Sequence, residues 1–165
     1  MTEPNIVLAR VDNRLVHGQV GVVWTAQCGT NLLLVANDFA AENELQQTLM
    51  SATAESSGVG IRFWTLQKTI DTIHKASPRQ KIFLIIQTPE DALVLAKGGV
   101  KFASLNIGNM HYSDGKIGLS NKVFVDEIDK QAFRDLIGLG VEVYLQELPN
   151  DKKVAVTNDF LEKNK

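Results

Sequence analysis

The sequence predicts a single α/β domain with an open, mainly parallel seven-stranded sheet and helices on both of its faces. Short apolar runs alternate with amphipathic stretches along the whole chain, and the connections between them are short. Most of these runs are continuously apolar, which is typical of strands buried on both faces of a parallel sheet. The 165 residues suit one domain covering 1–165, and we expect a polar tail after about residue 150.

Seven apolar runs are the predicted strands. In chain order they are NIVLARV from Asn5, NLLLVA from Asn31, GIRFWTL from Gly60, KIFLIIQ from Lys81, FASLNIG from Phe102, KVFV from Lys122 and VEVYLQE from Val141. Only the stretch from 108 to 121 interrupts the alternation, and we expect a long irregular segment there.

Helical spacing of apolar residues occurs between these runs. The stripes are Val16, Val20, Val23 and Trp24; Leu45 and Leu49; and Leu66, Ile70 and Ile73. Thr88 followed by Pro89 predicts the start of another helix, and Asp126 is a candidate cap for the last long one. We expect Gly98 and Gly99 to end the first of these helices and Gly138 and Gly140 to end the second.

The composition excludes several classes of function. A net charge of −2 gives no electrostatic reason to expect a nucleic acid or an anionic membrane surface as partner. The one cysteine, Cys28, excludes an internal disulfide and a thiolate metal site, and it suits a reducing cytosol. No secretion signal opens the chain, and its apolar stretches fall far short of the ~20 residues of a membrane span. We therefore expect a soluble cytoplasmic protein.

The loop after the first predicted strand is the candidate functional site. In open α/β sheets, ligands bind beyond the carboxyl ends of the strands, and here that position holds Asp12 and Arg14, followed by His17. The loop lacks the glycine patterns that bind nucleotide phosphates, and the chain has no hydrolase serine elbow or zinc-protease motif. His74 and His111 belong to other predicted elements, so we expect no metal site and no cofactor.

A histidine at a helix start, next to an arginine, suits a site that accepts a phosphoryl group. Free N–H groups at a helix start favour an anion, and Arg14 offers a planar fork for phosphate oxygens. An imidazole ordinarily titrates near neutrality, so the neutral ring of His17 is available as a nucleophile. Gly18 and Gly21 each cost a helix roughly 1 kcal/mol and are expected to leave room for a bulky group. The alternative is a packed histidine beside a solvated ion pair of Arg14 with Asp12.

The opening stretch NIVLARVDNRLVHGQVGVVWT resembles that of the IIB components of the mannose–fructose–sorbose family of the bacterial phosphotransferase system. The family motif is matched at Arg10, Asp12, Arg14, His17, Gly18, Gln19 and Val20. Similar segments recur as far as about Pro149. Two of them, GIRFWTLQKTIDTIHKA and NIGNMHYSDGK, look most like the subgroup that handles N-acetylgalactosamine or galactosamine.

The resemblance implies a phosphocarrier on a seven-stranded, mainly parallel sheet. His17 would accept the phosphoryl group from a phosphohistidine of the IIA component, on Nδ1 as in family members. It would then pass the group to a sugar that enters through the membrane components IIC and IID. Arg14, Gly18 and backbone N–H groups would hold the phosphate oxygens without a metal, while Arg10 would orient Asp12 or Arg14. The protein would be cytoplasmic and peripherally associated with the membrane transporter.

Further residues carry two interpretations each. In one interpretation, Asn106 or the N–H of Gly108 lines the phosphate site. In the other, the glycine serves only to reverse the direction of the chain. His111 contacts a partner or faces solvent. Leu15 and Val16 are expected to contribute apolar area to a docking face around the histidine.

The rival function is a flavodoxin-like nucleotide-binding or regulatory module without phosphoryl transfer. Such a binder needs glycines or hydroxyl groups around the phosphate, whereas this loop contains arginines and a histidine. An inactive interaction protein is disfavoured because both His17 and Arg14 are present.

Overall fold

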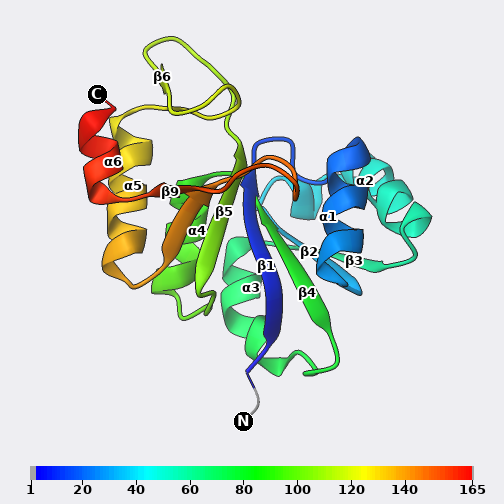
Figure 1. The fold of residues 1–165 in the computed structure, drawn as a ribbon. Helices are drawn as coiled ribbons and strands as arrows, with labels where there is room; N and C mark the ends of the chain where they lie inside the picture. The colour runs from blue at the N-terminus through cyan, green and yellow to red at the C-terminus, as the bar shows by residue number, and fades with distance from the viewer. Residues whose placement is uncertain (1–2, 165) are drawn as a thin grey trace.

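A seven-stranded sheet forms the centre of the computed structural model, which describes residues 3–164 except for the side chains of Gln19 and Val20 (Figure 1). The strand order is β3-β2-β4-β1-β5-β8-β9, and every neighbouring pair is parallel except β8 with β9. The strands are β1 Asn5–Asp12, β2 Leu32–Ala36, β3 Gly60–Trp64, β4 Lys81–Ile86, β5 Ser104–Asn109, β8 Glu142–Leu145 and β9 Val154–Val156. The predicted fold class is confirmed.

Helices cover both faces of this sheet, as predicted. Helices α1 and α2 pack on one face, and α3, α4, α5 and α6 pack on the other. Their bounds are α1 Gly18–Cys28, α2 Glu44–Ser56, α3 Leu66–Thr72, α4 Pro89–Lys97, α5 Glu127–Gly138 and α6 Asn158–Lys163, with 3₁₀ turns η1 Ala40–Glu42 and η2 Ile73–Lys75. Within residues 3–164, no helix has the length and apolar character needed to cross a bilayer.

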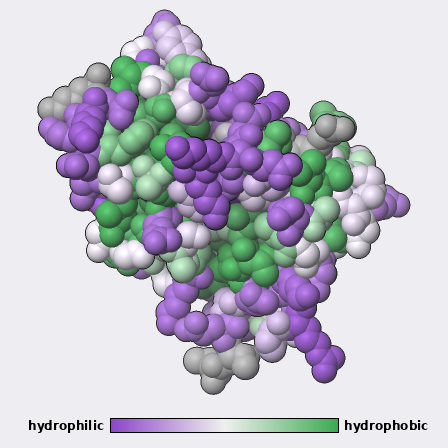
Figure 2. All heavy atoms as spheres, in the orientation of Figure 1, coloured by the Kyte–Doolittle hydropathy of each residue, from purple (hydrophilic) through white to green (hydrophobic). Residues whose placement is uncertain are grey.

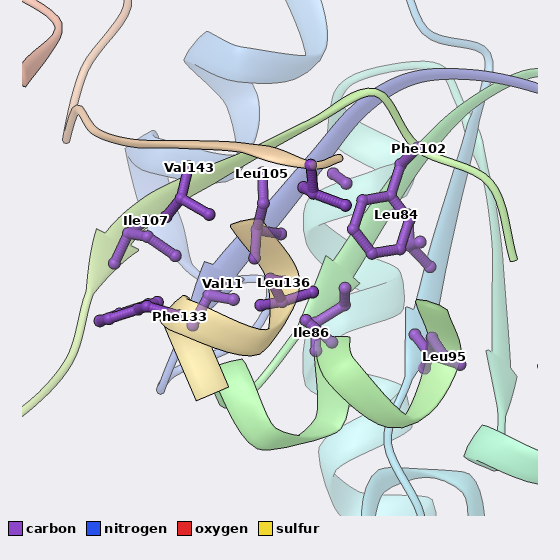
Figure 3. Close-up of a cluster of buried hydrophobic side chains, with 14 of the residues drawn as sticks. Val11, Leu84, Ile86, Leu95, Phe102, Leu105, Ile107, Phe133, Leu136 and Val143 are labelled. Atoms are coloured by element: carbon purple, nitrogen blue, oxygen red, sulfur yellow. The ribbon is translucent and has the colours of Figure 1, made fainter. Parts of the chain in front are cut away.

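The central strands are apolar on both sides because each one separates two cores. Along β4, Leu84 and Ile86 belong to the larger core beneath α4 and α5, while Phe83 and Ile85 belong to the smaller core beneath α1 and α2. Figure 3 shows the larger core, where Phe133 of α5 lies among the side chains of the strands. Full burial of each such side chain stabilises the fold by roughly 1.5–3 kcal/mol.

The seventh strand of the sheet is not the one that the sequence predicted. The run at 122–125 forms β7, Phe124–Val125, which pairs with β6, Ile117–Gly118, in a separate antiparallel hairpin. The sheet is completed instead by β9, which comes from the expected polar tail. The run is held instead beside Met110, just past the end of β5: the N–H of Met110 donates to the carbonyl of Lys122 at 2.9 Å, and the N–H of Phe124 donates to the carbonyl of Met110 at 3.0 Å.

Two helices begin at the predicted caps. The Thr88 hydroxyl accepts a hydrogen bond from the N–H of Asp91 at the start of α4, with Pro89 in the first turn. The Asp126 carboxylate accepts from the N–H of Asp129, whose own carboxylate accepts from the N–H of Asp126. This reciprocal pair is a capping box, which satisfies two donors that the helix itself leaves free.

Leu45 and Leu49 both lie in α2, at the predicted spacing of one face, but that face is not the buried one. Leu45 and Leu49 are 71% and 63% exposed, and the buried residues of α2 are Met50 and Ala54. A spacing of four residues shows that two side chains share a face of a helix, but it does not show which face meets the core.

The carboxyl end of β1 lies where the connections of the sheet diverge. β1 is central, between β4 and β5. After β1 the chain passes to α1 on one face, and after β4 it passes to α4 on the other. Figure 1 shows the loop after β1 and the long loop that carries β6 at the same end of the sheet. Ligand sites of open α/β sheets occur at such a point.

Candidate functional site

The connection from β1 to α1 is a tight turn that places His17 at the helix start. The N–H of Leu15 donates to the carbonyl of Asp12 at 2.9 Å, and Leu15 has a φ of 60°. This left-handed conformation costs a non-glycine residue roughly 1–2 kcal/mol, so the burial of the Leu15 side chain has to hold it. Gly18, with a φ of 40°, opens α1 in a conformation that other residues rarely adopt.

Asp12 holds the imidazole of His17. The Nε2 atom of His17 lies 3.2 Å from Oδ2 of Asp12, and the histidine side chain is 20% exposed. Burial opposes the ionisation of Asp12, but hydrogen bonds from His17 and from the N–H of Arg14, with the charge of Arg10, bring its pKa below the ordinary value. An ionised carboxylate only accepts hydrogen bonds, so Nε2 carries the hydrogen and Nδ1 of the neutral ring keeps its lone pair.

Arg14, three residues before His17, has an exposed side chain. Its guanidinium makes no hydrogen bond or ion pair with the residues that the structure describes. Arg14 and His17 border a hollow of about 440 Å³, which Leu49 and Met50 of α2 also line. Arg14, with its unpaired guanidinium, and the first turn of α1 therefore border the same hollow, and this arrangement suits a phosphoryl group.

Arg10 lies beneath the site. Its side chain is 2% exposed, and Nη1 donates to Oδ1 of Asn106 at 2.6 Å and to the carbonyl of Gln146 at 3.0 Å. Nη2 lies 3.4 Å from Oδ2 of Asp12. Burial lowers the pKa of Arg10 below its ordinary value, and the charge of Asp12 acts in the opposite direction. The structure thus places Arg10 in contact with Asp12 and not along the hollow beside His17.

The two candidate lining residues on β5 also lie beneath the surface. Asn106 is fully buried and bonded to Arg10, and its Nδ2 donates to the carbonyl of Gln146 at 2.9 Å. Gly108 is packed against the guanidinium of Arg10. Neither residue lines the hollow beside His17.

Asn13 ties the site loop to its neighbours. Its Nδ2 donates to the carbonyl of Gln87 at 3.1 Å, and its N–H donates to the carbonyl of Asn109 at 3.1 Å. Its Oδ1 accepts from the backbone N–H of His111, whose side chain is exposed. His74 lies exposed in η2, ahead of β4 and so toward the opposite end of the strands. The structure does not bring the three histidines together.

The expectation that Leu15 and Val16 contribute apolar area to a docking face is wrong. Leu15 and Val16 are only 6% and 5% exposed, so neither offers area to a partner. They are buried because the tight turn directs both side chains into the smaller core with α2. Val23 of α1 and Leu49 of α2 are among the apolar side chains that remain exposed on this side. Figure 2 shows hydrophobic side chains on the surface over these two helices, among hydrophilic ones.

Sequence reasoning missed a carboxylate cluster at the starts of α4 and α5. Carboxylate oxygens of Glu90, Asp126 and Asp129 lie within 4.8 Å of one another, and Nζ of Lys116 lies 3.2 Å from Asp129. Burial, reinforced by the hydrogen bond with Asp129, raises the pKa of Glu90 to about 7. The cluster joins Glu90 of α4 to the start of α5, 36 residues later in the chain, so no local motif could have revealed it.

Comparison with known proteins decides the family. A family model described as the sorbose-subfamily IIB component of the PTS system matches residues 6–165. The chain belongs to this IIB family. This IIB component is 52% identical to the N-acetylgalactosamine-specific phosphotransferase enzyme IIB component 1 of Escherichia coli, over 94% of the chain and 99% of that protein.

Other relatives agree with this assignment. The IIB component is 34% identical to the sorbose-specific EIIB component of Klebsiella pneumoniae, over 95% of the chain and 96% of that protein. The crystal structure of the E. coli N-acetylgalactosamine-specific IIB component 1 matches it with a TM-score of 0.91 and 50% identity, covering 93% of this chain and all of that one (100%). The matched family region includes the loop from Arg10 to Gly18, and it also includes β9 and α6.

Proposed function

We propose that this IIB component accepts a phosphoryl group on Nδ1 of His17 from a phosphohistidine of its IIA partner and transfers it to a sugar. The observation that carries the proposal is the contact of Nε2 with Asp12, because it leaves Nδ1 as the nucleophilic nitrogen. The guanidinium of Arg14 supports the same role, because it is exposed, has no partner among the described residues and belongs to a residue that borders the same hollow as His17.

In the first transfer, the Nδ1 lone pair of His17 attacks the phosphorus in line with the donor nitrogen. The new N–P bond forms as the old one breaks, and the bonding pair returns to the donor imidazole. Arg14 and the N–H groups of the first turn of α1 hold the equatorial oxygens. The ring of His17 becomes positively charged, and the carboxylate of Asp12 at Nε2 stabilises that charge.

In the second transfer, a hydroxyl oxygen of the sugar attacks the same phosphorus. The N–P bond breaks, its electron pair returns to Nδ1 of His17, and the proton of the hydroxyl passes to water. We propose an amino sugar of the N-acetylgalactosamine type, because the relatives named for that sugar are 52% identical and the sorbose-specific one is 34% identical. The sugar arrives through membrane components IIC and IID, so the protein acts in the cytoplasm, peripherally attached to them.

The test is phosphate incorporation from a phosphoenolpyruvate-driven relay that ends in the IIA component. We expect one acid-labile phosphoryl group, localised to His17 by mass spectrometry, and none in a folded His17→Gln variant. His74→Gln and His111→Gln are matched controls and should be phosphorylated at the parent rate. Labelling of folded His17→Gln protein would refute the assignment. Membranes that contain IIC and IID should then phosphorylate N-acetylgalactosamine faster than sorbose.

A further inference from the structure

We propose that Gly108 and Trp24 form a slot that holds the guanidinium of Arg10 and that this slot, acting through Asp12, sets the orientation and the tautomer of His17. Both are positioning residues, since neither lines the hollow beside the histidine. The expected effect on phosphoryl transfer rests on the proposed function, whereas the effect on the imidazole does not.

One wall of the slot is the backbone of Gly108. A Cβ atom at this position would lie 2.0 Å from Cζ of Arg10 and 2.1 Å and 2.4 Å from its two terminal nitrogens. Gly108 does not have a positive φ, so space is the reason that glycine is needed here. The β1–β5 register passes from Val11 with Ile107 to Asp12 with Asn109, so Gly108 is the extra residue of a β-bulge.

The other wall is the indole ring of Trp24 on α1. Cζ of Arg10 lies 5.2 Å from the centre of this ring, within the range of a cation–π contact. Trp24 is 4% exposed, and its Nε1–H donates to the carbonyl of Glu147 at 2.8 Å. The neighbouring carbonyl, that of Gln146, accepts from Arg10. The ring and the guanidinium are therefore anchored to the same short segment after β8.

One oxygen connects the slot to the reactive ring. Oδ2 of Asp12 faces Nη2 of Arg10 at 3.4 Å and Nε2 of His17 at 3.2 Å. Any displacement of the guanidinium therefore moves the Asp12 carboxylate or removes the positive charge beside it, and this carboxylate is the group that binds Nε2. Loss of that contact would release the preference for hydrogen on Nε2, and Nδ1 would no longer be the sole nitrogen with a lone pair.

The first experiment compares Gly108→Ala with Gly138→Ala. A Cβ at Gly138 would meet no atom within 4 Å, so this variant is a matched control. Nitrogen-15 NMR of the unphosphorylated protein should show a smaller fraction of the Nε2–H tautomer of His17 in Gly108→Ala only. Phosphorylation by the IIA partner should slow roughly 10- to 100-fold, as expected for a small misplacement of a reacting group. An unchanged tautomer fraction in folded Gly108→Ala protein would overturn the proposal.

A double-mutant cycle separates the slot from a direct role of Gly108. Lysine at position 10 lacks the planar fork that the added methyl group would strike. Gly108→Ala should therefore have little further effect on the rate in an Arg10→Lys background, whereas additive losses would show that Gly108 acts independently of Arg10 and would contradict the proposal.

Trp24→Phe provides a second variant if Gly108→Ala does not fold. It keeps an aromatic wall but removes the hydrogen bond to Glu147, so the tautomer fraction should shift in the same direction and by less. If folded Trp24→Phe protein has the same fraction of the Nε2–H tautomer of His17 as the parent, the result would count against the slot. If the parent protein takes up no phosphate at all, the proposed function is wrong, and the NMR comparison still decides whether the slot acts on His17.

Discussion

Nε2 of His17 faces Oδ2 of Asp12 at 3.2 Å, and this contact favours the hydrogen on Nε2 and the lone pair on Nδ1 of a neutral imidazole. The carboxylate is almost fully buried and ionised, so it binds the hydrogen on Nε2 before any partner arrives. In the proposed transfer, the imidazole would therefore not have to change its tautomer when the donor docks.

Asp12→Asn should impair both transfer and stability. Asparagine has one accepting oxygen and no charge, so it cannot accept at once from the N–H of Arg14 and from Arg10 and His17, and it binds hydrogen on Nε2 more weakly. We expect phosphorylation to slow by roughly 100-fold or more. Arg10 would also remain buried without its counter-charge, which lowers the free energy of unfolding by about 3–5 kcal/mol. Urea denaturation and single-turnover labelling measure the two effects, and labelling at the parent rate would show that the ring does not depend on Asp12.

Arg14→Lys should slow transfer and leave stability unchanged. The side chain is exposed and has no partner among the described residues, so its loss removes little from the fold. An ammonium group cannot replace a two-pronged contact with phosphate oxygens, and the expected loss is ~2–4 kcal/mol, or roughly 30- to 1000-fold in rate. Arg79→Lys, also exposed but located before β4, is the matched control. Equal rates for the two variants would exclude Arg14 from the phosphate site.

Glu90→Gln should flatten the dependence of stability on pH. The pKa of Glu90 is raised from 4.5 to about 7, so the folded state binds this proton more tightly than the unfolded chain does. Its stabilising contribution is therefore complete below pH 4.5 and is lost as the pH rises through about 7. The pKa of Asp129 is lowered, so its contribution is instead lost in acid. Urea denaturation across this range should give a shallower slope for Glu90→Gln than for the parent or for exposed Glu55→Gln.

Leu49→Asp should weaken the encounter with the IIA partner. Leu49 is 63% exposed and lines the same hollow as His17, so a phosphorylated donor that reaches the ring would lie over it. We expect KM for the donor to rise roughly 5- to 30-fold, about 1–2 kcal/mol, with kcat little changed. Ile128→Asp is the matched control, because Ile128 is 69% exposed on α5, across the sheet. A similar change in both variants would indicate a nonspecific effect of the added charge.

Local chemistry made much of the fold predictable. The apolar runs of β1 and β4 show two buried faces, and Thr88 and Asp126 mark helix starts because their side chains satisfy free N–H groups. The candidate loop was also predictable, because polar residues after a central strand lie at the edge where ligands bind. Each of these signals resides in a few adjacent residues.

Contacts between segments that lie far apart in the sequence were not predictable in the same way. The stretches 122–125 and 154–156 are both short, and which of them joins the sheet depends on how far the intervening chain can reach. Within the site, Arg10 binds a backbone carbonyl at Gln146, and a carbonyl has no signature in a sequence. The contact of Trp24 with Arg10 likewise exists only once α1 has packed on the sheet.

The partners of Arg10 have a consequence for the newly made chain. The hydrogen bond from Arg10 to Gln146 joins residues 136 positions apart, and that from Trp24 to Glu147 joins residues 123 apart. Synthesis proceeds from the N-terminus, so His17 leaves the ribosome long before β8 does. A nascent chain thus displays the His17 motif before the two carbonyls that anchor Arg10 and Trp24 have been made.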